Sequence, residues 1–176
     1  MKRTALAIAL AFALFGCSSK GPSANQDPAN VAPAQGAPEF SLENIRGGKT
    51  TSKDLHGKVT VVDFWATWCD PCKAEVPHFN KLSQDYKDKD VEIVGIAIES
   101  PRKDIAPTVK ELGINYTVLV GTDEVVDGFG GIIGYPTTYV VTKDWKIYKK
   151  YMGALSHKEE SLRKDIEKLL ADESAD

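Results

Sequence analysis

Two cysteines three positions apart, Cys69 and Cys72, are the residues whose type and spacing most directly indicate chemistry. A Cys-x-x-Cys pair between a strand and a helix is typical of a redox site, in which the two thiols form and open a disulfide. The unpaired N–H groups and the dipole at a helix N-terminus stabilise a thiolate. We therefore predict that Cys69 is the attacking sulfur and that Cys72, one turn further on, resolves the mixed disulfide.

Two carboxylates lie close to this pair in the sequence. Asp63 stands six positions before Cys69, in the middle of a run predicted to be a buried strand. Burial without a partner is costly for a carboxylate, so we expect a raised pKa and a proton exchange with Cys72. Glu75 lies three positions after Cys72. Its residue type alone favours a solvated helix face, because charged side chains are mostly exposed.

The elements that position these residues follow from the hydrophobic pattern. The β-branched and aromatic runs 59–65 and 91–98 are typical of strands buried on both faces. Between them, an apolar stripe with spacings of three and four predicts a helix; it consists of Val76, Phe79, Leu82 and Tyr86. Before these runs, residues 40–44 and 49–51 are predicted to form a hairpin. After them we predict a helix capped by Ser100 and ending at Gly113, a strand at 116–120, a short helix, and a hairpin of 137–141 with 146–151. The last helix begins with Ser156 and Glu159 as a capping box and buries Leu162, Ile166, Leu169 and Leu170. This order predicts an α/β fold with a mixed central sheet, helices on both faces and an N-terminal β-hairpin.

The runs Val61–Cys72 and Gly134–Thr137 resemble the thioredoxin superfamily, in particular its membrane-tethered TlpA/ResA-like branch of thiol-disulfide oxidoreductases. The resemblance implies a thioredoxin-like domain over residues 39–171. It also implies a cis peptide bond before Pro136, facing the cysteines. In such a fold we expect Tyr135, Pro136 and Thr137 to contact a bound peptide through the loop backbone, and Trp68 to meet partners at the rim of the site.

The same resemblance gives the two acids their functional interpretation. Asp63 matches the buried Asp of thioredoxins, and Glu75 matches the Glu that ResA-like proteins place near their cysteines. Asp70, between the cysteines, adds negative charge that opposes thiolate formation, which favours a reductase. The resemblance implies disulfide-bearing protein clients, among them apocytochrome c, and a membrane electron donor of the DsbD/CcdA type. An oxidant or isomerase of the same fold remains the main alternative.

Other function classes fit the sequence less well. A formal charge of −3 from 22 basic and 25 acidic residues lacks the basic footprint of a nucleic-acid binder. Cys69, Cys72 and His78 offer too few ligands for a structural zinc site, so we predict no metal and no cofactor, and a copper metallochaperone is the weakest alternative. A binding module without turnover would not require both cysteines.

The N-terminal residues predict an address outside the cytoplasm. Residues 1–16 combine Lys2 and Arg3 with an apolar run over 5–15, which is typical of a signal peptide and too short to span a membrane. The run ends in a motif that resembles a bacterial lipobox, which implies cleavage before Cys17 and its lipidation. Ser18 then favours the outer membrane. Residues 17–38 are predicted to tether the domain and 172–176 to form a disordered tail.

Overall fold

One mixed sheet of seven strands forms the centre of the computed structural model, which describes residues 36–172. In chain order the elements are β1 (Ser41–Asn44), β2 (Lys49–Thr51), the 3₁₀ helix η1 (Ser52–Leu55), β3 (Val59–Trp65), α1 (Asp70–Asp85), β4 (Val91–Ala97), α2 (Arg102–Glu111), β5 (Thr117–Val120), α3 (Asp123–Gly128), β6 (Thr137–Val141), β7 (Ile147–Met152) and α4 (Lys158–Asp172). The strand order is β2-β1-β5-β4-β3-β6-β7. The β3–β4 and β4–β5 pairs are parallel, and the other pairs are antiparallel. The predicted mixed sheet and the N-terminal hairpin are confirmed.

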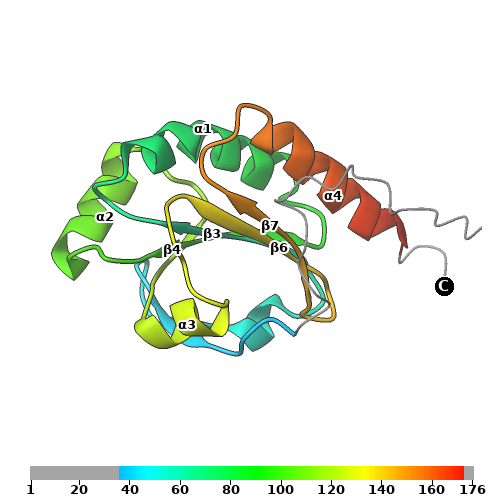
Figure 1. The fold of residues 1–176 in the computed structure, drawn as a ribbon, viewed down its shortest axis with the longest axis horizontal. Helices are drawn as coiled ribbons and strands as arrows, with labels where there is room; N and C mark the ends of the chain where they lie inside the picture. The colour runs from blue at the N-terminus through cyan, green and yellow to red at the C-terminus, as the bar shows by residue number, and fades with distance from the viewer. Residues whose placement is uncertain (1–35, 173–176) are drawn as a thin grey trace, which may run out of the picture.

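Two hydrophobic clusters fill the space on either side of the sheet. Helices α1, α2 and α4 cover one face, whereas α3 and η1 cover the other (Figure 1). Successive side chains of a strand point to opposite faces. Accordingly, Val61 of β3 packs with Phe79 and Leu162 on the α1 side, and its neighbour Val62 packs with Phe129 on the α3 side. The central strand is buried along its whole length, as its sequence predicts.

Helix α1 begins directly at the Cys-x-x-Cys motif. Cys69 is the N-cap residue, and Pro71 lies in the first turn, where its missing N–H group leaves no intrahelical bond unmade. The predicted apolar stripe faces the core, and the helix continues without interruption past Pro77. The first turn of α1 therefore places the two cysteines just beyond the end of β3, whose parallel neighbour in the sheet is β4.

Two predicted helix starts are displaced in the structure. Helix α2 has Pro101 as its N-cap, whereas the Ser100 hydroxyl accepts a hydrogen bond from Thr67 N and donates one to Ile98 O, both at 2.9 Å. Ser100 thus joins the loop after β3 to the loop after β4 and is not free to cap a helix. Pro107 lies inside α2 without breaking it.

Helix α4 begins at Lys158, so Ser156 lies outside the capping position that its spacing from Glu159 predicts. The Glu159 carboxylate instead contacts Arg163 of its own helix at 3.0 Å and His78 of α1 at 2.7 Å. The contact with His78 fastens the first turn of α4 to α1. The apolar side chains of α4 face the core as predicted, with Leu162 and Ile166 fully buried.

The first described residues already contact the domain. Ala37 is buried and its N–H group donates to Trp145 O at 2.9 Å, so residues 36–38, predicted as part of the tether, pack against the sheet. The signal peptide, Cys17 and most of the predicted tether lie outside the described residues. Within residues 36–172, no helix is long and apolar enough to cross a membrane.

Candidate active site

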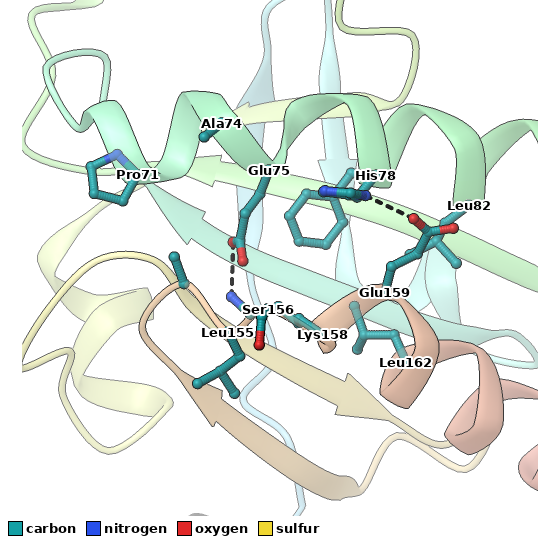
Figure 2. Close-up of a pocket in the computed structure, with 12 residues that line it drawn as sticks. Pro71, Ala74, Glu75, His78, Leu82, Leu155, Ser156, Lys158, Glu159 and Leu162 are labelled. Atoms are coloured by element: carbon teal, nitrogen blue, oxygen red, sulfur yellow. Dashed lines mark hydrogen bonds and ion pairs between the residues drawn. The ribbon is translucent and has the colours of Figure 1, made fainter.

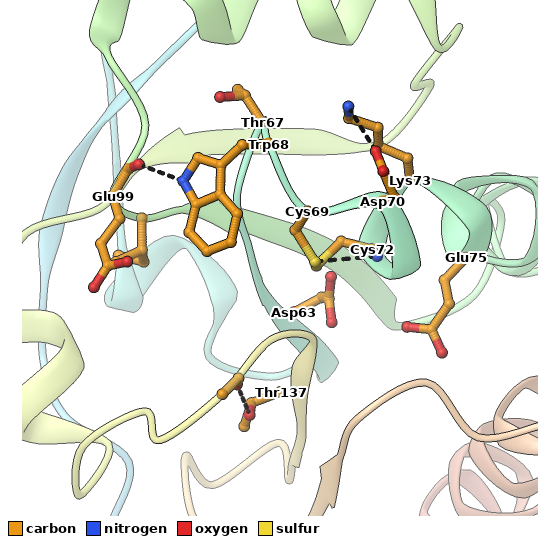
Figure 3. Close-up of a disulfide and its surroundings, with 12 residues drawn as sticks. Asp63, Thr67, Trp68, Cys69, Asp70, Cys72, Lys73, Glu75, Glu99 and Thr137 are labelled. Atoms are coloured by element: carbon orange, nitrogen blue, oxygen red, sulfur yellow. Dashed lines mark hydrogen bonds and ion pairs between the residues drawn. A yellow bond between two sulfur atoms is a disulfide. The ribbon is translucent and has the colours of Figure 1, made fainter.

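The centre of the site is a disulfide between Cys69 and Cys72, with an S–S distance of 2.09 Å. The Cys72 N–H group points at Cys69 Sγ with an N···S distance of 3.3 Å, as expected for an N-cap residue (Figure 3). Both cysteines are almost fully buried, but only Cys69 lines an open groove. Of the two cysteines, Cys69 is thus the one that borders a surface where a partner could bind.

The groove beside Cys69 has a volume of about 620 Å³. It is lined by Trp68, Cys69, Asp70, Pro71, Glu99, Ile132, Ile133, Gly134 and Tyr135. Two of its large apolar side chains are exposed to solvent, since Ile133 is 84% and Trp68 56% exposed. Exposed apolar side chains around a reactive group are typical of a surface that binds a partner.

The rim of the groove is held by contacts of Trp68 and of the loop before β6. Trp68 Nε1 donates to Glu99 O at 2.8 Å (Figure 3). The Trp68 indole ring also meets the Tyr135 ring edge-on, with 5.7 Å between the ring centroids. The Tyr135–Pro136 peptide bond is cis, as the resemblance implied. The Thr137 side chain is buried and its hydroxyl donates to Gly134 O at 2.7 Å, so this side chain fixes the loop.

Asp63 lies beneath the disulfide on the sheet face covered by α1 and α4, with its carboxylate pointing toward the cysteines (Figure 3). The residue is 3% exposed, and the Thr138 hydroxyl donates to its Oδ1 at 2.8 Å. Burial raises the pKa of Asp63 to about 7, against the opposing effects of the Lys158 ammonium and the Thr138 hydrogen bond. A carboxyl group with this pKa can take or release a proton near neutral pH.

Glu75 is not on a solvated helix face. It is 7% exposed, and Lys158 Nζ lies 2.8 Å from its Oε2 in a buried ion pair (Figure 2). Both side chains line a cavity of about 370 Å³ between α1 and the start of α4. The other lining residues are Pro71, Ala74, His78, Phe79, Leu82, Ala154, Leu155, Ser156, Glu159 and Leu162. The solvated-face interpretation is therefore wrong: α4 covers this side of α1, and Lys158 supplies the counter-charge.

Sequence reasoning missed Lys158 and Thr138, which connect the two acids. Lys158 precedes Leu162 and Ile166 by four and eight residues, so it lies on the buried stripe of α4. A lysine on an apolar stripe indicates that a buried group of opposite charge pairs with it, so this pairing could have been predicted from the sequence. His78, weighed as a metal ligand, instead pairs with Glu159, and no group of three metal-binding side chains occurs in residues 36–172.

A thioredoxin-like fold with a disulfide at the start of its first long helix defines the class: a thiol-disulfide oxidoreductase. The chain belongs to the AhpC/TSA family, whose model matches residues 33–150, and within it to the ResA-like thiol-disulfide oxidoreductases.

Comparison with known proteins supports this assignment. The chain is 36% identical to thiol-disulfide oxidoreductase ResA of Bacillus thuringiensis (strain Al Hakam) over 119 residues, which cover 66% of this chain and 68% of the relative. It is 30% identical to ResA of Bacillus subtilis (strain 168) over 128 residues, or 72% and 71% of the two chains. The crystal structure of a thioredoxin-family thiol:disulfide interchange protein of Chlorobium tepidum TLS is similar, with a TM-score of 0.71 and 29% identity, and covers 80% of this chain and 99% of that one.

Proposed function

We propose that this oxidoreductase reduces disulfides in client proteins outside the cytoplasm. The observation that supports disulfide exchange is the asymmetry of the cysteine pair: Cys69 lines the groove and Cys72 does not. Asp70, exposed between the cysteines, adds a negative charge that disfavours a thiolate and hence favours a reducing couple. Lys73 pairs with Asp70 at 3.2 Å, but an exposed pair of this kind is screened by water and offsets the charge only in part.

In the proposed reaction, the Cys69 thiolate attacks one sulfur of a client disulfide. A mixed disulfide forms, and the first client sulfur leaves and takes up a proton. Cys72 then gives its proton to Asp63 and attacks Cys69 Sγ, which closes the Cys69–Cys72 disulfide. The second client sulfur leaves and is protonated. Two electrons pass from the domain to the client, so the client gains two thiols and the domain becomes oxidised.

The roles of the two cysteines are tested by trapping the mixed disulfide. A synthetic peptide with a single disulfide is mixed with the reduced Cys72→Ser variant, and the products are weighed by mass spectrometry. We expect a stable adduct on Cys69 of Cys72→Ser and no adduct with Cys69→Ser. An adduct that forms on Cys72 of the Cys69→Ser variant with equal rate would contradict the assignment.

The client is proposed to bind in the groove beside Cys69. There Trp68 and Tyr135 would flank the scissile disulfide, and the backbone around Pro136 and Thr137 would pair with the client chain. Glu75, with Asp63, would serve the proton transfers. Apocytochrome c is the proposed client class, and a membrane protein of the DsbD/CcdA type is the proposed electron donor, because a reductase in an oxidising compartment needs a supply of electrons.

The proposed location follows from the N-terminal sequence. Residues 1–16 would direct export, Cys17 would carry the lipid, and the rest of 17–38 would join the anchor to the domain of 39–171, with the outer membrane favoured by Ser18. The main alternative, an oxidant or isomerase, uses the same cysteines and is separated from a reductase by the reduction potential of the pair.

A further inference from the structure

A lysine lies buried among the acidic groups beneath the disulfide. Lys158, in the first turn of α4, is 4% exposed, and its side chain extends from α4 toward Glu75 of α1 (Figure 2). A lysine is almost never buried to this degree unless its charge is paired. Removing one partner of such a pair leaves an uncompensated charge in the interior. In this buried position, Lys158 therefore depends on the neighbouring acids to balance its charge.

Three hydrogen bonds join Lys158 to both acids of the site. Its Nζ donates to Glu75 Oε2 at 2.8 Å and to Thr138 Oγ1 at 3.3 Å, and the Thr138 hydroxyl donates to Asp63 Oδ1 at 2.8 Å. Thr138 is in position for this because it pairs directly with Asp63 across β6 and β3. A continuous chain of polar contacts thus runs from α1 through α4 and β6 to the carboxylate beneath the cysteines.

The strand on the other side of β3 offers no charge to Asp63. On β4, the residue that pairs with Asp63 is Gly95. A Cβ atom at Gly95 would lie 3.1 Å from both Trp65 and Tyr116. A larger side chain at Gly95 is therefore disfavoured. The positive charge near Asp63 is that of Lys158, which belongs to α4.

Other titratable groups within residues 36–172 lie near Lys158, but none of them supplies the positive charge that faces Glu75 and Asp63. On α1, His78 bonds to Glu159 of α4 at 2.7 Å, so this pair is engaged at the other end of the cavity. Tyr116, just before β5, is buried close to both Asp63 and Glu75, and burial raises the pKa of its hydroxyl, which keeps it neutral. Lys158 is thus the cation that contacts Glu75 directly and Asp63 through Thr138.

We propose that Lys158 is a positioning residue for the resolving step of thiol–disulfide exchange, because its ammonium group favours the ionised form of Asp63, which takes the proton of Cys72. The inference rests on the proposed function, since it requires Cys72 to resolve a mixed disulfide. When Asp63 takes the proton, Cys72 Sγ bonds to Cys69 Sγ and the bond from Cys69 to the client breaks. The client sulfur leaves as a thiolate and takes a proton from solvent. Without the cation, Asp63 holds a proton more strongly and fewer molecules can begin this step.

The test measures the resolving rate against pH in wild type and Lys158→Met, which removes the charge and retains a long apolar side chain. Reduced protein is mixed with a single-disulfide peptide, quenched with an alkylating agent and analysed by mass spectrometry from pH 5 to 9. We expect the wild-type rate to rise through an inflection near pH 7. In Lys158→Met the inflection moves up by about one pH unit, so the rate at pH 6 falls about tenfold and recovers by pH 9.

Two further variants separate a change in charge from a loss of structure. Lys164→Met makes the same substitution on an exposed position of α4 and should retain the wild-type profile. Lys158→Arg restores the charge and should return the inflection toward pH 7. An unchanged profile in Lys158→Met, or a rate lowered equally at every pH, would overturn the inference. If the wild-type protein forms no mixed disulfide at all, the proposed function itself has failed.

Discussion

Thr138 of β6 donates its hydroxyl hydrogen to Asp63 of β3 at 2.8 Å, in a part of the sheet that is closed to solvent on both faces. This hydrogen bond and the nearby charge of Lys158 stabilise the ionised carboxylate, but burial outweighs them and raises the pKa of Asp63 to about 7. The domain therefore keeps a carboxyl group poised near neutral pH directly beneath its disulfide, although ionising it in this position costs stability.

The cost should appear in the pH dependence of unfolding. Between pH 4 and 7 the folded protein holds a proton on Asp63 that the unfolded chain has released, so stability falls as pH rises through this window. Relative to wild type, Asp63→Asn should gain about 4 kcal/mol of unfolding free energy between pH 4 and pH 8, because one pKa unit corresponds to about 1.4 kcal/mol. Urea unfolding of the oxidised proteins at a series of pH values measures this difference.

The matched control for that measurement is Asp88→Asn, which changes an exposed aspartate after α1. Its difference from wild type should remain constant within about 0.5 kcal/mol across the same pH range. A constant difference for Asp63→Asn as well would show that Asp63 ionises in the folded protein as it does in the unfolded chain, which contradicts the poised carboxyl group.

Client binding should depend on the exposed apolar side chain of Ile133. If a client covers it, Ile133→Ser loses about 1.5 kcal/mol of apolar burial, and KM for a disulfide-bearing protein should rise about tenfold with kcat unchanged. Met152→Ser alters an exposed side chain on β7, outside the groove, and should leave KM unchanged. Steady-state reduction of a protein disulfide measures both constants. Equal KM values for wild type and Ile133→Ser would place the client elsewhere.

Gly121, directly after β5, packs closely against the end of β4 and against Ile98, which follows β4. A Cβ atom there would lie 2.0 Å from Ile98 Cδ1 and 2.8 Å from Ile96 Cγ2. Gly121→Ala should therefore lower the unfolding free energy by about 1–3 kcal/mol through overpacking. Gly134→Ala, where a Cβ atom meets nothing within 4 Å, should unfold like wild type within about 1 kcal/mol. Equal stability of the two variants, measured by thermal unfolding, would contradict the close packing of Gly121 against Ile96 and Ile98.

The proposed anchor predicts where the full chain is found in a bacterial cell. Cys17→Ser should move the protein from the membrane fraction to the soluble fraction, because the thiol that would carry the lipid is lost. Ser18→Asp should keep it membrane-bound and shift it toward the inner membrane. Immunoblots of separated membranes distinguish these results. A Cys17→Ser protein that remains in the membrane fraction would rule out lipid attachment at this cysteine.

Much of the fold was predictable because the information was local. The β-branched and aromatic run of β3 predicted burial on both faces, and the Cys-x-x-Cys motif predicted Cys69 at a helix start, as the structure has it. The environment of Glu75 was not predictable in this way. Its burial depends on how α4 packs against α1, and its partner Lys158 is 83 residues further along the chain.

Helix starts were misplaced for a related physical reason. Ser100 has the side chain of a good N-cap, but its hydroxyl joins Thr67 and Ile98 across two loops. Local capping preferences compete with such tertiary hydrogen bonds. The residues next to Ser100 in the sequence do not indicate that its hydroxyl bonds to Thr67. The same holds for Glu159, whose carboxylate contacts His78 across the helix layer.

The most direct test of the account is the reduction potential of the Cys69–Cys72 pair. It is measured by equilibrating the protein in defined glutathione and dithiothreitol buffers and counting the free thiols by alkylation and mass spectrometry. A client-reducing role predicts a potential near or below about −230 mV, in the range of thioredoxin-type reductases. A potential near or above about −150 mV would place the protein with disulfide oxidants and contradict the proposed direction of electron flow.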